Sequence, residues 1–363
     1  MKKVLLVSPY PYSKTGRGMD VLTECFEEED WDTNHLKFPN VFYSVNKSNS
    51  FDTKVTEFTS KKALIPYVDG FMKWFPRFLF NIMVKYQQKK ASFIDFSKYD
   101  YVVLESGKPL FLLDKIPHKT KIIYRQSDSV RHVLGKNRYY IALEDKVYSR
   151  ATKIIVVKDR FKNLLDSQTQ KKVRVIRNGY SFPKDVNLSN PYRGDRKNAI
   201  YVGLTKLDAP TLKSICLKND NLDVHIFGNC ITPWDLKKLN KIENFYYHGF
   251  EPRDVYLSYI KYADVAIFPF KPWDAMEWVG FTSKYLNFMY FKLPVVSYLT
   301  GELSEFDGMG VLFPKDAEEF AVMVKDVIER GEKVDSKIDF HFYSHPQRKK
   351  EYKEFIKECE NGD

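Results

Sequence analysis

The sequence of 363 residues lacks the features that mark several large protein classes. It has only four cysteines, at positions 25, 216, 230 and 359, and no CxxC pair, which argues against a disulfide framework and against a cysteine zinc site. The seven histidines show no metal-ligand spacing, and the GxxxxGK[ST] and HExxH motifs are both missing. We therefore expect neither a metal nor a cofactor.

Long apolar segments are missing as well. No apolar run reaches the roughly 18 residues that a membrane-spanning helix needs. The first residues, MKKVLLVS, contain too short an apolar stretch for a signal peptide. The sequence thus predicts a cytoplasmic protein that is either soluble or attached to the inner face of the plasma membrane.

Positive charge and aromatic side chains are abundant. The net charge is +11, and Phe, Trp and Tyr make up 16% of the residues. Such a charge favours an anionic partner, which could be a nucleic acid, a nucleotide phosphate or a lipid surface. Composition alone does not choose between these partners.

The segment 63–93 concentrates both of these features. Residues 54–92 carry eight Lys or Arg side chains against two acids, among many large apolar residues. This mixture is typical of a helix that lies on an anionic membrane surface. The alternative is an ordinary amphipathic helix that packs on the core and turns its cations to solvent.

Short β-rich apolar runs alternate with amphipathic stretches, which predicts parallel βαβ units. In the first half the predicted strands are 3–7, 100–105, 121–124 and 153–157, with a helix over 138–150. In the second half they are 199–203, 222–228, 245–249, 265–269, 295–298 and 311–313, with helices over 252–262 and 317–330. We predict two doubly wound α/β domains, 1–180 and 199–335, joined by a polar linker over 181–198. The remaining residues, 336–363, contain a charged helix that either packs back on the first domain or forms a solvated tail.

In the first domain, polar residues follow the predicted strands. Asp128 comes after the strand 121–124 and can act as a general base toward a sugar hydroxyl, or it can cap a following helix. Arg125 is an anion clamp or a salt-bridge partner, and Glu105 contacts an acceptor or anchors a neighbouring strand end. Gly16, in the loop after the first strand, is likewise expected either to contact the acceptor or to support the residues that do.

In the second domain, glycines and hydroxyl groups follow several strands. Gly203 and Thr205 follow the first strand, Gly228 follows the second, and Phe250 comes directly after the glycine that ends the third. Ser283 and Lys284 lie at the predicted start of another helix, where free N–H groups and an ammonium favour phosphate. Together these positions predict a nucleotide-binding site.

Five sequence blocks resemble the GT-B glycosyltransferases, and within them the bacterial inverting glucuronosyltransferase family that builds xanthan-type polysaccharide. The blocks are 100–107, 122–128, 199–203, 224–228 and 259–270, and the resemblance covers about residues 1–335. It implies a GT-B fold of two Rossmann-like domains that face each other across a cleft.

The resemblance also assigns roles to residues. It implies that Asp128 is the general base, that Ser283, Lys284 and Asn287 lie at the diphosphate, and that Phe270 borders the nucleotide. The family has a tyrosine at the position of Phe270 and a longer amide at that of Asn287. The loop between Phe270 and Ser283 differs too, so the sugar pocket is expected to differ.

The resemblance implies inverting transfer of a sugar from a UDP-sugar to a lipid-linked oligosaccharide. The sugar is glucuronic acid in that family, and the product belongs to exopolysaccharide, capsule or cell-wall glycan synthesis. Retaining GT-B enzymes carry two glutamates where this chain has Val279 and Asn287. Two alternatives stay open: a nucleic-acid-binding or scaffold protein that uses the basic surface, and a sugar-nucleotide epimerase of the same architecture. The glycosyltransferase prediction, unlike the first of these alternatives, expects no nucleic acid partner.

Overall fold

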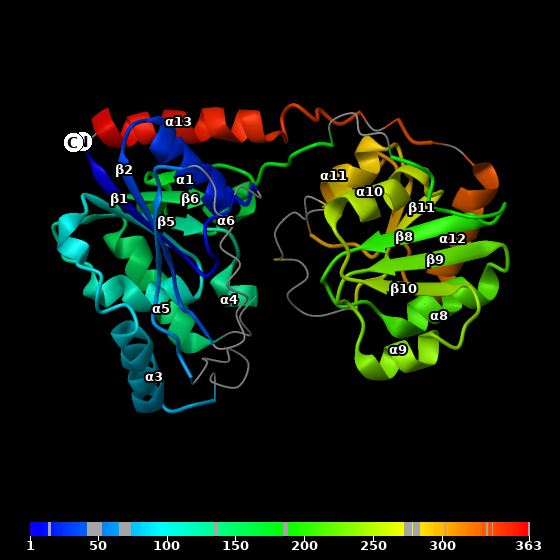
Figure 1. Ribbon diagram of the computed structural model, residues 1–363, viewed down its shortest axis with the longest axis horizontal. Helices are drawn as coiled ribbons and strands as arrows, with labels where there is room; N and C mark the ends of the chain where they lie inside the picture. Colours follow the sequence, from blue (N-terminus) through cyan, green and yellow to red (C-terminus); the bar gives the residue numbers. More distant parts are fainter. Residues whose placement is uncertain are drawn as a thin grey trace. The chain divides into compact units, whose positions relative to one another are not determined.

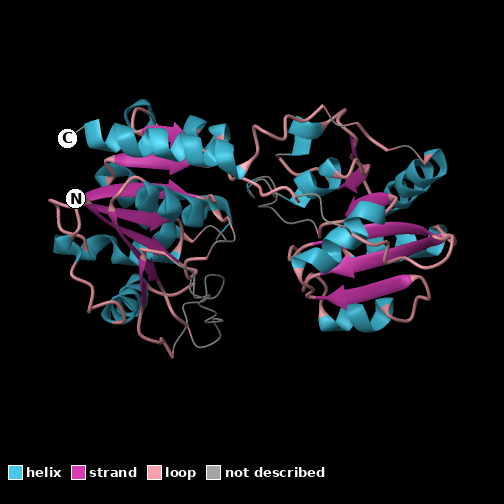
Figure 2. Cartoon of the chain, turned by 45° about the horizontal axis from the view of Figure 1, so that its top comes forward, coloured by secondary structure: helices cyan, strands magenta, loops and turns pink. Residues whose placement is uncertain are grey.

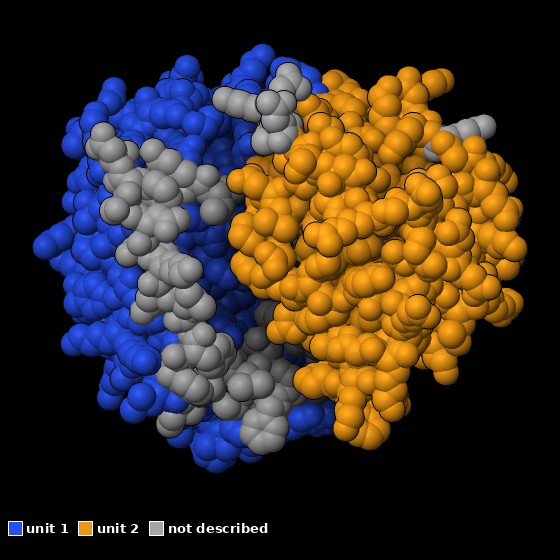
Figure 3. All heavy atoms as spheres, turned by 45° about the vertical axis from the view of Figure 1, so that its right-hand side comes forward, with its two compact units in different colours: residues 1–181, 278–280, 341–363 blue, residues 182–277, 281–340 orange. Residues whose placement is uncertain are grey.

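The computed structural model describes residues 1–13, 16–41, 53–64, 74–133, 137–183, 188–271, 278, 284–301, 303–331, 333–335 and 337–361. The chain forms two compact units, which Figure 3 shows in two colours. Unit 1 consists of Met1–Ser181, Trp278–Gly280 and His341–Asp363, and unit 2 consists of Phe182–Glu277 and Phe281–Phe340. Each unit is built around one parallel β-sheet with helices packed on it (Figures 1 and 2).

The sheet of unit 1 has the strand order β3-β2-β1-β4-β5-β6-β7, and its neighbouring strands pair in parallel. Because β1 lies inside the sheet and the strand order reverses there, the connections wind in both directions. The strands are β1 Lys3–Ser8, β2 Asp32–Lys37, β3 Thr56–Thr59, β4 Tyr101–Glu105, β5 Lys121–Gln126, β6 Lys153–Val156 and β7 Val173–Val175.

Both faces of this sheet are covered, since successive strand residues contribute to opposite cores. Leu5 and Val7 of β1 belong to one hydrophobic cluster, whereas Val4 and Leu6 belong to the other. This is why β1 and β4 are continuous apolar runs in the sequence rather than alternating ones. The helices of unit 1 are α1 Gly18–Glu28, α3 Arg77–Lys89, α4 Val130–Val133, α5 Arg138–Arg150, α6 Asp159–Asn163, α7 Ser167–Gln170 and α13 His345–Asn361, with the 3-10 turns η1 Phe96–Lys98 and η2 Lys108–Lys115.

The C-terminal helix α13 packs on unit 1, where it lies beside α1 (Figure 1). Tyr352, Phe355 and Ile356 are fully buried in the same cluster as the side chains of α1. At the edge of this contact, the ammonium of Lys349 lies 2.7 Å from a carboxylate oxygen of Glu28. The helix is therefore an integral layer of unit 1 and not a solvated tail.

The sheet of unit 2 has the order β10-β9-β8-β11-β12-β13, again with parallel neighbours. The strands are β8 Lys197–Val202, β9 Leu222–Phe227, β10 Phe245–Gly249, β11 Val265–Phe268, β12 Val295–Ser297 and β13 Val311–Leu312. The helices are α8 Ala209–Lys218, α9 Pro233–Leu239, α10 Arg253–Tyr262, α11 Lys284–Tyr290 and α12 Ala317–Arg330, with the 3-10 turn η4 Leu303–Phe306. Each unit is thus a doubly wound α/β fold, as the sequence predicts.

Three strands of unit 1 have no counterpart among the predicted ones. Strand β2, DTNHLK, is rich in polar residues that are nevertheless buried, so no apolar run marks it. Strands β3 and β7 form the two edges of the sheet and have four and three residues. Among the described residues, no helix combines the length and the apolar character needed to cross a membrane.

Candidate active site

Asp128 lies in the turn that joins β5 to α4, at the carboxyl edge of the unit 1 sheet. Its side chain is exposed, and its backbone N–H donates to the hydroxyl of Ser106 at 3.3 Å. The hydroxyls of Ser106 and Ser127 are 2.8 Å apart. Because Ser106 follows β4, the loops after two neighbouring strands hold each other. Open α/β sheets bind their ligands at this edge.

Asp128 lies two residues before the first residue of helix α4. Helix α4 begins at Val130, so Ser129 is the residue directly before it. The hydroxyl of Ser129 lies 2.7 Å from Nδ1 of His132 within the first turn. The exposed carboxylate of Asp128 is thus one residue further from the helix.

Arg125 and Glu105 form a buried ion pair between β5 and β4, with 3.0 Å between Arg125 Nη1 and Glu105 Oε1. The Ser8 hydroxyl donates to Glu105 Oε2 at 2.7 Å. Arg125 is only 1% exposed and also donates to Asn178 at 2.9 Å and to Tyr352 of α13 at 3.3 Å. Burial disfavours the charged guanidinium, but Tyr352 and Glu105 more than offset it, so the pKa of Arg125 is raised. Arg125 is thus a salt-bridge partner, and Glu105 anchors the neighbouring strand ends through Arg125 and Ser8.

Gly16 has a structural role in the same region. Its φ is 79°, and a Cβ there would lie 1.9 Å from the imidazole of His345 at the start of α13. Only glycine allows both this backbone conformation and this approach.

In unit 2, the predicted glycines meet at the carboxyl ends of β8, β9 and β10. A Cβ on Gly228, whose φ is 101°, would lie 2.0 Å from the carbonyl oxygen of Gly203. The N–H of Gly228 donates to the carbonyl of Gly249. Because these three residues are glycines and lie so close together, backbone atoms rather than side chains form the surface at the carboxyl ends of β8, β9 and β10.

The other predicted contacts of unit 2 differ in exposure. Thr205 is half-buried, and its carbonyl accepts from the hydroxyl of Tyr201 at 3.1 Å. Phe250 is 84% exposed just after β10, so its ring is available to a ligand. Phe270 is only 4% exposed and packs against Tyr201 and Phe268, which gives it a place in the core.

The remaining predicted contacts are Ser283, Lys284 and Asn287, and the last two belong to helix α11. Ser283 and the side chain of Lys284 lie outside the described residues, as does Val279. Asn287 is buried, and its amide oxygen accepts no hydrogen bond from the part of the chain that the structure describes. A buried acceptor without a donor costs about 1–3 kcal/mol, which leaves it ready for a donor group from elsewhere.

Glu144 is a buried carboxylate that is not among the residues predicted for the site. It is 0% exposed and lies on the face of α5 that packs against the sheet. Burial raises its pKa to about 7, although Tyr124 and Arg131 act in the opposite direction. The signal was present in the sequence, because Tyr140, Glu144 and Val147 follow the i, i+4, i+7 spacing of a buried helix face.

Two family models match the sequence, one in each half. Residues 42–157 match the N-terminal domain of glucuronosyltransferase GumK. Residues 206–330 match the glycosyl transferases group 1. No curated protein has a sequence that matches this chain.

Solved structures share the whole architecture at low sequence identity. Sucrose-phosphate synthase from Thermosynechococcus elongatus has a TM-score of 0.72 at 12% identity, with 100% of both chains covered. Anabaena Alr3699/HepE in complex with UDP-glucose has a TM-score of 0.62 at 14% identity, covering 99% of this chain and 100% of that one. The MnaA-UDP co-structure from S. aureus has a TM-score of 0.58 at 14% identity, covering 99% and 97%. These similarities show that the chain has a GT-B fold, in which residues 42–157 are similar to the N-terminal domain of glucuronosyltransferase GumK and residues 206–330 are similar to the group 1 glycosyltransferases.

Proposed function

We propose that this protein is an inverting glycosyltransferase that transfers a sugar from a UDP-sugar to a lipid-linked oligosaccharide during polysaccharide synthesis. The observation that carries the proposal is the exposed carboxylate of Asp128 at the carboxyl end of β5, within the segment that matches the GumK domain. That match favours glucuronic acid as the sugar. The proposed place of action is the cytoplasmic face of the membrane.

The proposed reaction is a single displacement. Asp128 accepts the proton of the acceptor hydroxyl while that oxygen attacks the anomeric carbon. The bond from the anomeric carbon to the diphosphate breaks, and UDP leaves with the electron pair. The hydrogen bond from the Asp128 backbone to Ser106 supports this role, because it restrains the turn that carries the carboxylate.

In this proposal unit 2 holds the donor. The exposed ring of Phe250 offers a face for the uracil base, and backbone at Gly203 and Gly228 can approach the nucleotide closely. Thr205 lies beside these glycines. Ser283, Lys284 and Asn287 hold the diphosphate, with the lysine ammonium neutralising the charge of the leaving group, so no metal is required. The similar fold of HepE, solved with UDP-glucose, supports a UDP-sugar as the donor.

The configuration of the product tests this mechanism. A UDP-α-sugar such as UDP-glucuronic acid should yield a β-linked product, since one displacement inverts the anomeric centre. NMR of the product formed on a synthetic glycolipid acceptor measures that configuration. An α-linked product would contradict the proposal, and it would point to the retaining mechanism instead.

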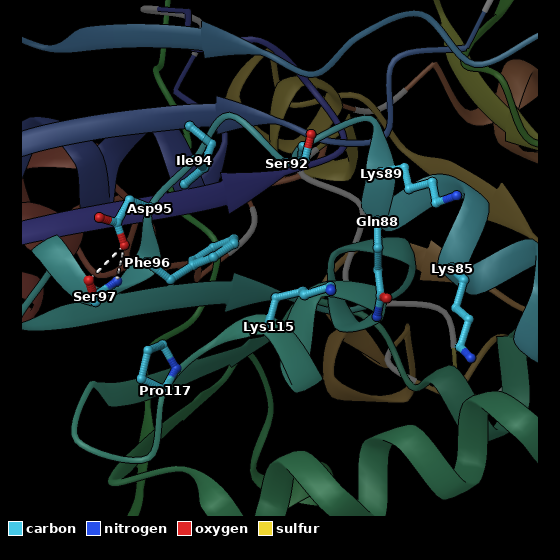
Figure 4. Close-up of a pocket in the computed structure, with 11 residues that line it drawn as sticks. Lys85, Gln88, Lys89, Ser92, Ile94, Asp95, Phe96, Ser97, Lys115 and Pro117 are labelled. Carbon is cyan, nitrogen blue, oxygen red and sulfur yellow. Dashed lines mark hydrogen bonds between the residues drawn. The ribbon is translucent and has the colours of Figure 1, made fainter.

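The proposal includes attachment to an anionic membrane through α3, in the segment 63–93. On the exposed face of this helix, Phe78 is 62% and Ile82 56% exposed. Lys85 and Lys89 project from the helix next to a pocket of about 440 Å³ (Figure 4). Lys115 lines the same pocket, and none of these lysines pairs with an acid in the described part of the chain. Apolar side chains beside unpaired ammonium groups suit a lipid surface with phosphate head groups.

Reversal of two charges on α3 should weaken membrane binding. Each lysine near an anionic surface contributes about 1 kcal/mol, so Lys85→Glu with Lys89→Glu should lower the affinity by roughly 10–1,000-fold. Co-sedimentation with vesicles that contain phosphatidylserine measures the change. The control is Lys237→Glu with Lys238→Glu on α9 of unit 2, which alters the net charge equally. Equal losses in both variants would show that overall charge, and not α3, drives binding.

A further inference from the structure

We propose that Glu144 is a positioning residue for Asp128, acting from beneath the turn that carries the base. This inference rests on the proposed function, since it assigns Glu144 a role in the same reaction. Glu144 itself is fully buried, so the proposal gives it no contact with the donor or the acceptor.

The contacts of Glu144 reach the chain on both sides of Asp128. Its Oε1 accepts from the Tyr124 hydroxyl at 2.8 Å and from the Gln126 amide at 3.4 Å, both on β5. Its Oε2 lies 3.4 Å from Nε of Arg131 on α4. The strand before Asp128 and the helix after it are therefore joined through one carboxylate.

A second contact holds the same turn from the neighbouring loop. The Asp128 N–H bonds to Ser106, which follows β4, while Glu144 supports the turn from α5. The turn is thus restrained at the backbone of Asp128 and at both of its ends. Such support fixes a reacting group to within the small tolerance that catalysis requires.

Packing alone does not account for Glu144. It occupies a position on α5 between the buried side chains of Tyr140 and Val147, where an apolar residue would fill the space without a charge. A buried carboxylate is unfavourable unless it is paired and hydrogen-bonded. Arg131 supplies the opposite charge beside Oε2, and the hydrogen bonds go to Oε1, while Oε2 accepts none from the described residues. Arg131 also pairs with the exposed Asp145, so its pair with Glu144 joins α4 to the interior in addition to the packing of Val130 in the core.

The charge state of Glu144 gives the proposal a pH dependence. The titratable or charged groups that face it are Tyr124 of β5, Arg131 of α4, and Asp145 and Tyr148 of its own helix. Burial raises the pKa of Glu144 to about 7, so the carboxylate that attracts Arg131 is present above this pH and becomes protonated below it. Positioning of Asp128 should therefore weaken as the pH falls through 7.

Glu144→Gln in the full-length chain tests the proposal. The amide keeps the size of the side chain but removes the charge that holds Arg131. We expect kcat for transfer from UDP-glucuronic acid to a synthetic glycolipid to fall about tenfold with the donor KM unchanged, and the step in kcat near pH 7 to disappear. Hydrogen exchange of the amides in residues 127–131 should accelerate, and this readout does not depend on turnover.

Asp145→Asn is the matched control, because it alters a neighbouring carboxylate that binds the same arginine from the exposed side. It should leave kcat above pH 7 and the exchange rates unchanged, and it should keep the step in kcat while moving it to a somewhat lower pH, because the charge of Asp145 raises the pKa of Glu144. Arg131→Gln should reproduce the Glu144→Gln phenotype and Arg131→Lys should restore part of the activity, which keeps the test decisive if Glu144→Gln fails to fold.

The two proposals can fail separately. If Asp128→Asn abolishes transfer while Glu144→Gln changes neither kcat, the pH profile nor the exchange of residues 127–131, the role of Glu144 is refuted and the base assignment stands. If Asp128→Asn retains activity, the proposed function fails, whereas faster exchange in Glu144→Gln alone still shows that Glu144 restrains the turn.

Discussion

Replacement of Asp128 by asparagine is expected to lower kcat for sugar transfer by about 10²–10⁴-fold. The amide has almost the same shape as the carboxylate but cannot take the proton from the hydroxyl group of the sugar acceptor. The affinity for UDP should be unchanged, because Asp128 belongs to unit 1 and the proposed nucleotide contacts belong to unit 2. Release of UDP from UDP-glucuronic acid in the presence of a glycolipid measures kcat, and calorimetric titration measures UDP binding.

A matched control separates the loss of a base from the loss of a charge. Asp114→Asn makes the same chemical change on η2. There the side chain is exposed, and its Oδ1 lies 3.8 Å from the ammonium of Lys146. It should leave kcat within a factor of about two, because surface pairs contribute little. Full turnover by Asp128→Asn would rule out Asp128 as the base.

The second large effect concerns α13. Phe355→Ala should destabilise unit 1 by about 3–5 kcal/mol, because this ring is fully buried between α13 and the sheet. Differential scanning calorimetry should show a lower transition for unit 1 and an unchanged transition for unit 2. Binding of UDP should survive at temperatures where transfer is lost.

Lys357→Ala is the control for this prediction, since it shortens an exposed side chain on the same helix. It should shift neither transition by more than the small amount typical of surface substitutions. A Phe355→Ala variant as stable as the wild type would show that α13 is dispensable for the folding of unit 1.

Much of the fold follows from the sequence because parallel strands buried on both faces are continuous apolar runs. Strands such as β1, KVLLVS, and β11, VAIF, were predictable for this reason, and α5 and α12 were predictable from their amphipathic spacing. Strand β2 was not, because its buried Asn34 and His35 are polar, and their hydrogen bonds with Tyr99 and with the Tyr10 carbonyl form only in the folded structure.

The candidate site was predictable to a different extent. The order of residues placed Asp128 and the glycines Gly203 and Gly228 just after strands, and strand ends are where such folds bind ligands. The roles of Arg125 and Glu105 could not be read from the chain, since an arginine that clamps an anion and one that pairs with a buried glutamate look alike in sequence. Phe250 and Phe270 likewise look equivalent, yet one ring is exposed and the other lies in the core.

The sequence by itself determined the two doubly wound α/β units and the position of Asp128 after β5, because periodicity and strand order are local properties of the chain. Only the tertiary structure decided that α13 completes unit 1, that Arg125 is fully paired inside, and that Glu144 joins both sides of the turn with Asp128. Burial and pairing arise between residues far apart in the chain. Arg125 and Tyr352, 227 positions apart, meet only after the sheet and the C-terminal helix have packed together.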